Sequence, residues 1–209
     1  KARMDDATDA LTGDEALTYV NNSPDTLRHV FFHLYQEAFV QGSYLEKLEG
    51  GLRSGKDGDV DYAGTKINSL MVDGTPLKQE QDNTILKVWL QQPLGPGERI
   101  TFRINFTTHW TADVYRRMKL FNSWGSKHYD GVHWYPRISV YDARFGWDTQ
   151  QHLGSEFYGD FGAFDVDLDF PHEYVIDATG WLQNESEVLP MDLKAKLAIA
   201  NFKDKPWNE

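Results

Sequence analysis

The chain has no cysteine among its 209 residues. Disulfide bridges and thiolate metal sites are therefore excluded, although this absence does not decide the compartment. No apolar run approaches the roughly 18 residues that a membrane-spanning helix needs, so no membrane span is predicted. The sequence also lacks a Gly-x-Ser-x-Gly elbow, a phosphate-binding loop and a dinucleotide-binding glycine pattern. These absences leave no common nucleophile or nucleotide motif.

Basic residues are scarce as well. The chain has 21 Lys and Arg against 32 Asp and Glu, which gives a net charge of -11. Nucleic-acid binding needs clustered positive charge, so a nucleic-acid partner is excluded and an anionic membrane surface is disfavoured. Aromatic residues are plentiful at 14%, and they favour β-strands and a broad aromatic contact surface.

Alternating apolar and polar residues predict β-strands along most of the chain. The clearest is 99–108, where Ile100, Phe102, Ile104 and Phe106 point inward. Further strands are predicted at 16–21, 28–35, 65–72, 84–90, 163–170, 174–178 and 194–200. A Pro-Gly-rich turn at 91–97 predicts that 84–90 and 99–108 form an antiparallel hairpin.

Helical signals are few. Ser43 as N-cap, Glu46 three residues later and Gly50 at the end predict one short helix over 43–49. About ten short strands with little helix predict an all-β fold. We expect a β-sandwich or saddle of mixed, mainly antiparallel sheets, with at most one or two short helices.

The ends of the chain suggest a portion of a longer protein. The sequence opens within a predicted strand and without an initiator Met, and residues 203–209 are polar and contain Pro206. We therefore expect one β-domain over 1–202 and a linker over 203–209. Between Trp110 and Gly146 the periodicity is lost and aromatic residues crowd together, which is typical of a functional or interface segment.

Three segments resemble metal sites. His172-Glu173 begins like a zinc-binding His-Glu-x-x-His helix, but the second His is missing and the flanking Pro171 favours an exposed turn between two strands. The carboxylates at 165, 167 and 169 lie about 6.6 Å apart on one strand face, too far apart to share an ion. The acidic loop 57–61 departs from the EF-hand pattern, and calcium binding there stays open. No metal ligand is predicted.

Several runs carry a resemblance to a known family: 133–142, 146–147, 156–161 and 178–184. They resemble the N-terminal domain of the aminopeptidase N family of zinc metallopeptidases, in its bacterial branch, and the similarity spans most of the chain. The resemblance implies a β-saddle that packs on a separate catalytic domain of the same parent chain. That catalytic domain would hold the zinc and act on the peptide substrate, so this chain would contain no catalytic residue and no cofactor of its own. Export fits this branch, although no residue here decides it.

The resemblance also implies where the domain interface and substrate contacts lie. The expected interface residues are Trp124, Trp134, Tyr135, Tyr141 and Trp147. In the family this domain lends a Gln or Glu that holds the substrate amine, but the matching residue here is Lys127.

Other residues of the same stretch are therefore the candidates for substrate binding: Asp130, His133 and Tyr135. A carboxylate such as Asp130 would suit a cationic amine. Two alternatives remain open: the catalytic domain supplies the amine contact alone, or this loop only packs at the interface. A different function is a catalytically silent binding or scaffold module that contacts a protein or, through exposed Trp, a carbohydrate.

Overall fold

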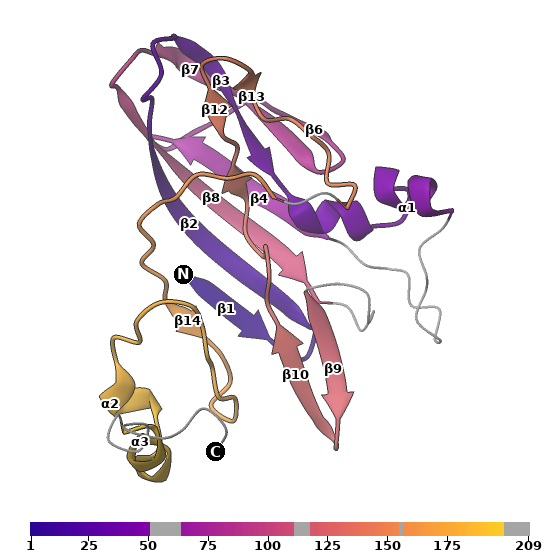
Figure 1. Ribbon diagram of the computed structural model, residues 1–209, viewed down its shortest axis with the longest axis vertical. Coiled ribbons are helices and arrows are strands. Elements are labelled where there is room, and N and C mark those ends of the chain that lie inside the picture. Colours follow the sequence, from indigo (N-terminus) through magenta and orange to yellow (C-terminus); the bar gives the residue numbers. More distant parts are fainter. Residues whose placement is uncertain (51–63, 111–117, 155–156, 199–209) are drawn as a thin grey trace, which may run out of the picture. The chain divides into compact units, whose positions relative to one another are not determined.

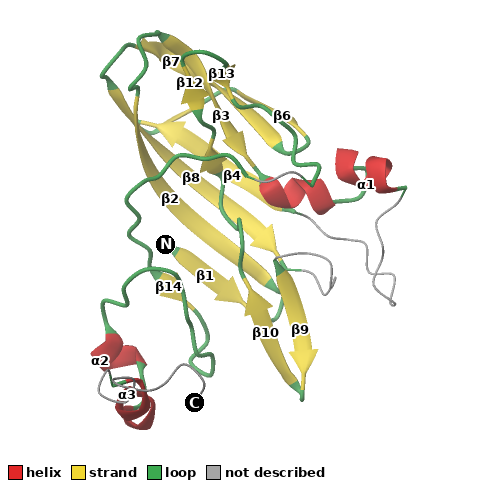
Figure 2. Ribbon diagram, in the orientation of Figure 1, coloured by secondary structure: helices red, strands yellow, loops and turns green. Residues whose placement is uncertain are grey.

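The computed structural model describes residues 1–50, 64–110, 118–154 and 157–198. The chain divides into two compact units, Lys1–Tyr174 and Val175–Glu209. The first unit is built from strands, and the second has two short helices in its described part, α2 (Glu185–Val188) and α3 (Met191–Leu197) (Figures 1 and 2). The single domain expected over 1–202 stays a prediction, and the expected linker 203–209 lies outside the described residues.

Two sheets make up most of the first unit. The six-stranded sheet has the order β14-β1-β2-β8-β4-β5, and the four-stranded sheet the order β11-β3-β7-β6. The six strands are β1 (Ala2–Asp5), β2 (Ala10–Val20), β4 (Thr65–Val72), β5 (Thr75–Pro76), β8 (Arg99–His109) and β14 (Leu168–Asp169). The four strands are β3 (Leu27–His33), β6 (Gln79–Asp82), β7 (Ile85–Leu94) and β11 (Arg137–Ile138). Only the β1–β14 pair among them is parallel.

Two small ribbons and two short helices complete this unit. The ribbons are β9 (Lys119–Ser123) with β10 (Ser126–Asp130), and β12 (Tyr141–Asp142) with β13 (Gly146–Trp147). The helices are the 3-10 helix η1 (Tyr35–Phe39) and α1 (Tyr44–Glu49). The predicted all-β class is confirmed. Short helices are more numerous than predicted, because α2 and α3 lie in the second unit. No helix in the described part of the chain is long and apolar enough to cross a membrane.

The core lies between the two sheets. On β8, Phe102, Ile104 and Phe106 are buried, as the alternation of 99–108 predicted. Phe32 and Val88 from the four-stranded sheet face them, and the rings of Phe32 and Phe102 meet edge to face at 5.5 Å between centroids. Burial of such aromatic pairs supplies much of the driving force for folding.

The predicted hairpin between 84–90 and 99–108 is wrong. β7 lies in the four-stranded sheet and β8 in the six-stranded one, and the chain crosses between sheets near Gly95. β8 is already paired on both edges, with β2 and β4. The buried Asn21 fixes this crossing: its side chain donates to the carbonyl of Leu94 at 3.0 Å, and its backbone carbonyl accepts from Gly97 at 2.7 Å.

The predicted helix is confirmed. α1 spans Tyr44–Glu49, and the hydroxyl of Ser43 accepts a hydrogen bond from the backbone N–H of Glu46 at 3.1 Å. Gly50 follows with φ of 77°, a left-handed conformation that glycine adopts without strain. The calcium hypothesis for the loop 57–61 falls outside the described residues.

The other corrections lie between 110 and 200. The predicted strand 163–170 is reduced to β14, because only Leu168 and Asp169 find a partner, on β1. No strand forms at 174–178, and residues 194–197 of the strand predicted at 194–200 belong to α3. The stretch expected to be irregular contains the β9–β10 hairpin.

The predicted turn at His172-Glu173 is confirmed, closed by a 3.1 Å bond from the N–H of Tyr174 to the carbonyl of Pro171. The structure has β14 before this turn but no strand directly after it. The turn therefore does not join two strands, as the sequence had suggested.

Candidate functional site

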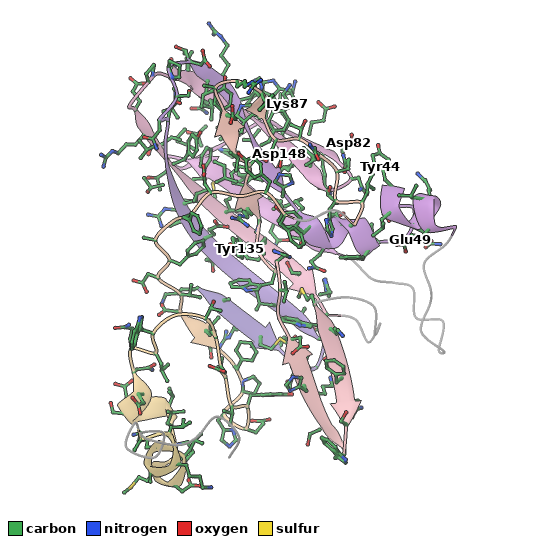
Figure 3. All side chains as sticks on the ribbon, viewed as in Figure 1. Tyr44, Glu49, Asp82, Lys87, Tyr135 and Asp148 are labelled. Carbon is green, nitrogen blue, oxygen red and sulfur yellow. The ribbon has the colours of Figure 1, made fainter. Side chains whose placement is uncertain are left out.

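The candidate site is a surface formed by the loop after β10 and the extended segment 157–166. Tyr135 from the loop packs edge-on against Phe164 of the segment, with centroids 5.9 Å apart, and His133 contacts Phe157 at 3.6 Å. Tyr135 is labelled in Figure 3. We call this surface the aromatic face and define it as His133, Tyr135 and residues 157–166.

The loop that carries His133 and Tyr135 is fixed to β8 of the six-stranded sheet and to η1. The indole of Trp134 packs on Phe106 of the core at 6.2 Å, and the Trp134 carbonyl accepts a 2.8 Å hydrogen bond from the hydroxyl of Thr108. Gln36 of η1 donates to the carbonyl of Val132 at 2.9 Å. These contacts hold the loop in a defined conformation, so His133 and Tyr135 are presented by a rigid support.

The segment 157–166 turns large apolar side chains to solvent. The exposed fractions are 57% for Tyr158, 105% for Phe161, 68% for Phe164 and 47% for Val166. Its backbone is held by Arg137, whose Nη2 donates to the carbonyl of Asp160 at 3.0 Å. The guanidinium lies directly over Gly159, where an added Cβ would be 2.0 Å from Nη2. The exposed rings therefore belong to a segment whose backbone is held in place by Arg137.

A cluster of histidine and aromatic rings adjoins the aromatic face and shares His133 and Phe157 with it. His33, at the end of β3, stacks on Tyr35 with a centroid distance of 5.1 Å and parallel planes. Tyr35 also contacts His133 at 4.8 Å, Phe157 at 4.7 Å and His152 at 5.7 Å. We call these five residues, His33, Tyr35, His133, His152 and Phe157, the histidine cluster. Through His33 of β3 it connects the four-stranded sheet to the aromatic face.

A cavity of about 140 Å³ opens beside the cluster. Its lining comprises His33, Tyr35, Asp148, Gln150, Gln151, His152, Phe157 and Tyr158. His33 is only 3% exposed, and its Nε2 lies 3.6 Å from Oδ2 of Asp148. Burial lowers the pKa of His33 more than the Asp148 carboxylate raises it. The imidazole is thus neutral near pH 7 and offers one donor and one acceptor.

The residues predicted to bind substrate lie in different surroundings. His133 belongs to the cluster and adopts a left-handed conformation with φ of 53°, and Tyr135 belongs to the aromatic face. Asp130 instead places Oδ1 3.2 Å from Nε2 of His128, and its carbonyl accepts from the indole of Trp110 at 2.8 Å. Substrate binding by these residues stays a prediction.

Lys127 makes hydrogen bonds to other residues of this chain. Its Nζ donates to Oδ1 of Asp9 at 2.7 Å and to the carbonyl of Asp6 at 2.6 Å. Among the described residues, no group of three or more His, Cys, Asp or Glu side chains is placed to hold a metal ion.

Most of the predicted interface residues pack against other residues of this chain. Trp147 packs between Tyr19 at 6.0 Å and Phe31 at 6.1 Å, and the hydroxyl of Tyr141 donates to Asp25 at 2.8 Å. Trp124 by contrast is fully exposed. The alternation of residues 163–170 predicts a strand with one buried face, but Phe164 and Val166 of that face are exposed. Tyr158 and Phe161 precede the predicted strand, and no periodic pattern marks them.

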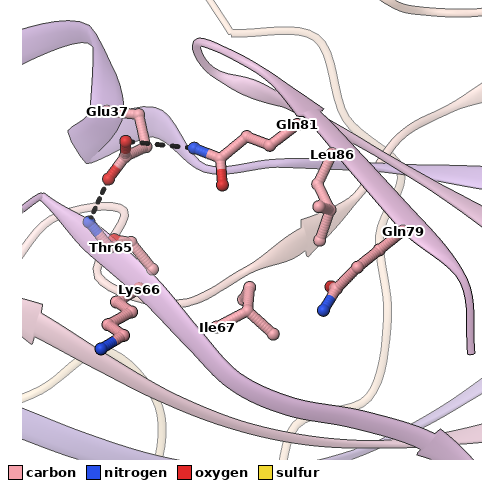
Figure 4. A pocket seen from close by; sticks show the side chains of 7 residues that line it. All are labelled: Glu37, Thr65, Lys66, Ile67, Gln79, Gln81 and Leu86. Carbon is pink, nitrogen blue, oxygen red and sulfur yellow. Dashed lines mark hydrogen bonds between the residues drawn. The ribbon is translucent and has the colours of Figure 1, made fainter. Parts of the chain in front are cut away.

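A larger cavity, of about 400 Å³, lies between β4 and β6 (Figure 4). One oxygen of Glu37 accepts from the backbone N–H of Thr65 at 2.7 Å, and the other accepts from the amide of Gln81 at 3.1 Å. Burial raises the pKa of Glu37 to about 7. Because both carboxylate oxygens are engaged, Glu37 joins η1, β4 and β6 and closes one end of this cavity.

Comparison with known proteins gives a partial likeness. No family profile matches the chain, and no curated protein matches it. Among solved structures, a two-domain M1 zinc metallopeptidase bound to L-tryptophan aligns at a TM-score of 0.32 and 16% identity, over 49% of this chain and 17% of that one. The M1 zinc metallopeptidase from Deinococcus radiodurans aligns at 0.31 and 17%, over 49% and 17%. A form of that protein bound to a Tyr-Ser-Ala substrate aligns at 0.35 and 15%, over 57% and 21%. The chain thus spans about a fifth of the length of the structures it matches.

Proposed function

We propose that this chain is the non-catalytic N-terminal domain of a zinc-dependent aminopeptidase, and that its aromatic face packs on the catalytic domain and shapes the substrate cleft. The observation that carries the proposal is the exposure of Phe161 and Phe164 on the segment 157–166. Contiguous exposed apolar residues mark interaction sites, because their contact with water is unfavourable and a partner would relieve it.

The sequence resemblance supports the choice of partner. The runs 133–142 and 156–161 resemble the aminopeptidase N family, and they also supply His133, Tyr135 and Phe157 of the aromatic face. The residues that carry the resemblance are therefore those displayed for contact. In this arrangement the zinc and the hydrolytic residues belong to the partner domain, while His133 and Tyr135 border the cleft and exclude water from it.

Hydrogen exchange on the parent protein tests the docking. We expect amides of 157–166 to exchange at least about ten-fold more slowly in the parent than in the 209-residue chain, as burial at an interface requires. Phe161→Ser should weaken that protection, whereas the matched variant Phe145→Ser should leave it unchanged. Phe145 is 77% exposed but lies outside the aromatic face.

Bound zinc and hydrolysis of aminoacyl p-nitroanilides by the parent test the enzymatic part. Protection of 157–166 without zinc or hydrolysis would favour the scaffold module, and equal exchange in both proteins would refute docking through this face.

A further inference from the structure

Two hairpins of this chain turn through the same backbone geometry. Asp73-Gly74 joins β4 to β5 with φ of 47° and 75°, and Trp124-Gly125 joins β9 to β10 with φ of 54° and 81°. In each case the flanking residues pair directly, Val72 with Thr75 and Ser123 with Ser126. Both are two-residue loops with two left-handed residues, the type I′ turn.

The two turns differ in the residue that occupies the first position. Asp and Asn suit a left-handed position because their short polar side chains bond locally, whereas a bulky residue is strained there. Asp9 and Asn83, also left-handed, follow this rule, and the left-handed His133 packs on Tyr35 and Phe157. Trp124 does not, and its indole is 102% exposed. Within the part of the chain that the structure describes, no packing of the indole offsets the strain at Trp124.

The hairpin that carries Trp124 is well supported at its base. β9 and β10 pair along their full length, and Phe121 contacts His128 across the strands at 5.7 Å. Tyr129 packs on Trp110 at 5.4 Å, and Lys127 is bonded to Asp9. The tip is thus displayed on a preorganised ribbon, which reduces the entropy lost on binding.

We propose that this ribbon is a docking hairpin whose Trp124 inserts into an apolar pocket of the partner domain. The inference rests on the proposed function and adds a second contact to the aromatic face. β10 ends at Asp130, and the chain enters the aromatic face at His133, so both contacts belong to one continuous stretch. An exposed Trp is the side chain most suited to such an anchor.

Other occupants fit the hairpin less well. A net charge of -11 opposes an anionic membrane surface. A second copy would have to receive the indole in one of the described cavities. The larger cavity is lined mainly by polar side chains, among them Glu37, Lys66 and Gln79. The smaller one, of about 140 Å³, has aromatic walls from Tyr35 and Phe157, but an indole there would lie against the polar groups of His33 and Asp148.

The variant Trp124→Asp, which copies the Asp73 turn, tests the inference. In the 209-residue chain it should raise Tm by about 2–4 °C, because the strain is relieved. In the parent protein it should speed exchange of the 122–127 amides at least about ten-fold, because the anchor is lost. Trp124→Asn should behave in the same way.

Asp73→Trp is the matched control, and it should lower Tm without changing exchange at 122–127. Protection of 157–166 in the parent without protection of 122–127 would overturn the docking hairpin and leave the proposed function standing. Protection of neither segment would overturn both. An unchanged or lower Tm for both Trp124 variants would overturn the strain argument.

Discussion

The ring of Phe106 occupies the space that a side chain at Gly13 would need. A Cβ built on Gly13 would lie 2.2 Å from Cζ of the ring, and Phe106 is itself buried in the core opposite this residue on β2. Gly13→Ala should therefore lower the free energy of unfolding by about 1–3 kcal/mol or more, as overpacking does. Urea unfolding followed by fluorescence measures this. Ala16→Ser, at an exposed position of the same strand, serves as the control and should have little effect. If Gly13→Ala kept the urea midpoint of the wild type, the ring of Phe106 would have to move aside without cost.

Glu15 makes stability depend on pH. It follows Gly13 on the inward side of β2, and its buried Oε2 has no hydrogen-bond partner among the described residues. Burial raises its pKa to about 7 from 4.5. The folded protein keeps the proton to a higher pH than the unfolded chain, so the contribution of Glu15 is fully present below pH 4.5 and is lost as pH rises to about 7.

Glu15→Gln should remove this loss. At about pH 8 the variant should be more stable than wild type by about 1–3 kcal/mol, and near pH 4 the two should be similar. Urea unfolding across this range checks the difference. Glu80→Gln, at an exposed position, serves as control. Glu37 titrates in the same window, so some pH dependence should persist in Glu15→Gln. If the free energy of unfolding depended on pH in the same way in wild type and in Glu15→Gln, the assignment of this dependence to Glu15 would be wrong.

Gln151 holds the β6–β7 turn to the histidine cluster. Its Oε1 accepts from Nδ2 of Asn83 at 3.1 Å and from the backbone N–H and hydroxyl of Thr84 at 3.0 and 2.8 Å, and its Nε2 donates to the carbonyl of Asp82 at 2.8 Å. Gln151→Ala removes these hydrogen bonds and should cost about 1–3 kcal/mol of stability. Thermal unfolding measures it, with the exposed Gln150→Ala as control. Equal melting temperatures for Gln151→Ala and Gln150→Ala would mean that water replaces the hydrogen bonds of the Gln151 amide.

Local signals predicted part of the fold well. The helix α1 follows from Ser43, Glu46 and Gly50, because a capped helix is specified by residues close in sequence. The bounds of β4 and the inward side chains of β8 were likewise predicted, because each depends on one face meeting the core. Pairing was harder: β7 and β8 are adjacent in sequence but belong to different sheets, which no single-strand pattern reveals.

The candidate site was also predicted only in part. The β9–β10 hairpin was missed because Trp124-Gly125 does not resemble the usual Asn-Gly or Asp-Gly turn. The segment 157–166 was missed because alternation shows which side chains share a side but not whether anything covers them. Phe164 and Val166 share a side, and here it faces solvent. The histidine cluster combines residues from distant parts of the chain, which sequence spacing alone does not bring together.

The tie between the sheets at Asn21 has a consequence for producing the protein. Asn21-Asn22-Ser23 matches the acceptor pattern for N-glycosylation, yet Asn21 is 0% exposed and its Nδ2 donates to the carbonyls of Asp25 and Leu94. An oligosaccharyltransferase could reach this nitrogen only before the chain folds, and an attached glycan would then keep the crossing from closing. In a glycosylating secretory host, modification and folding would compete for the same side chain, so the yield of folded protein would depend on which is faster.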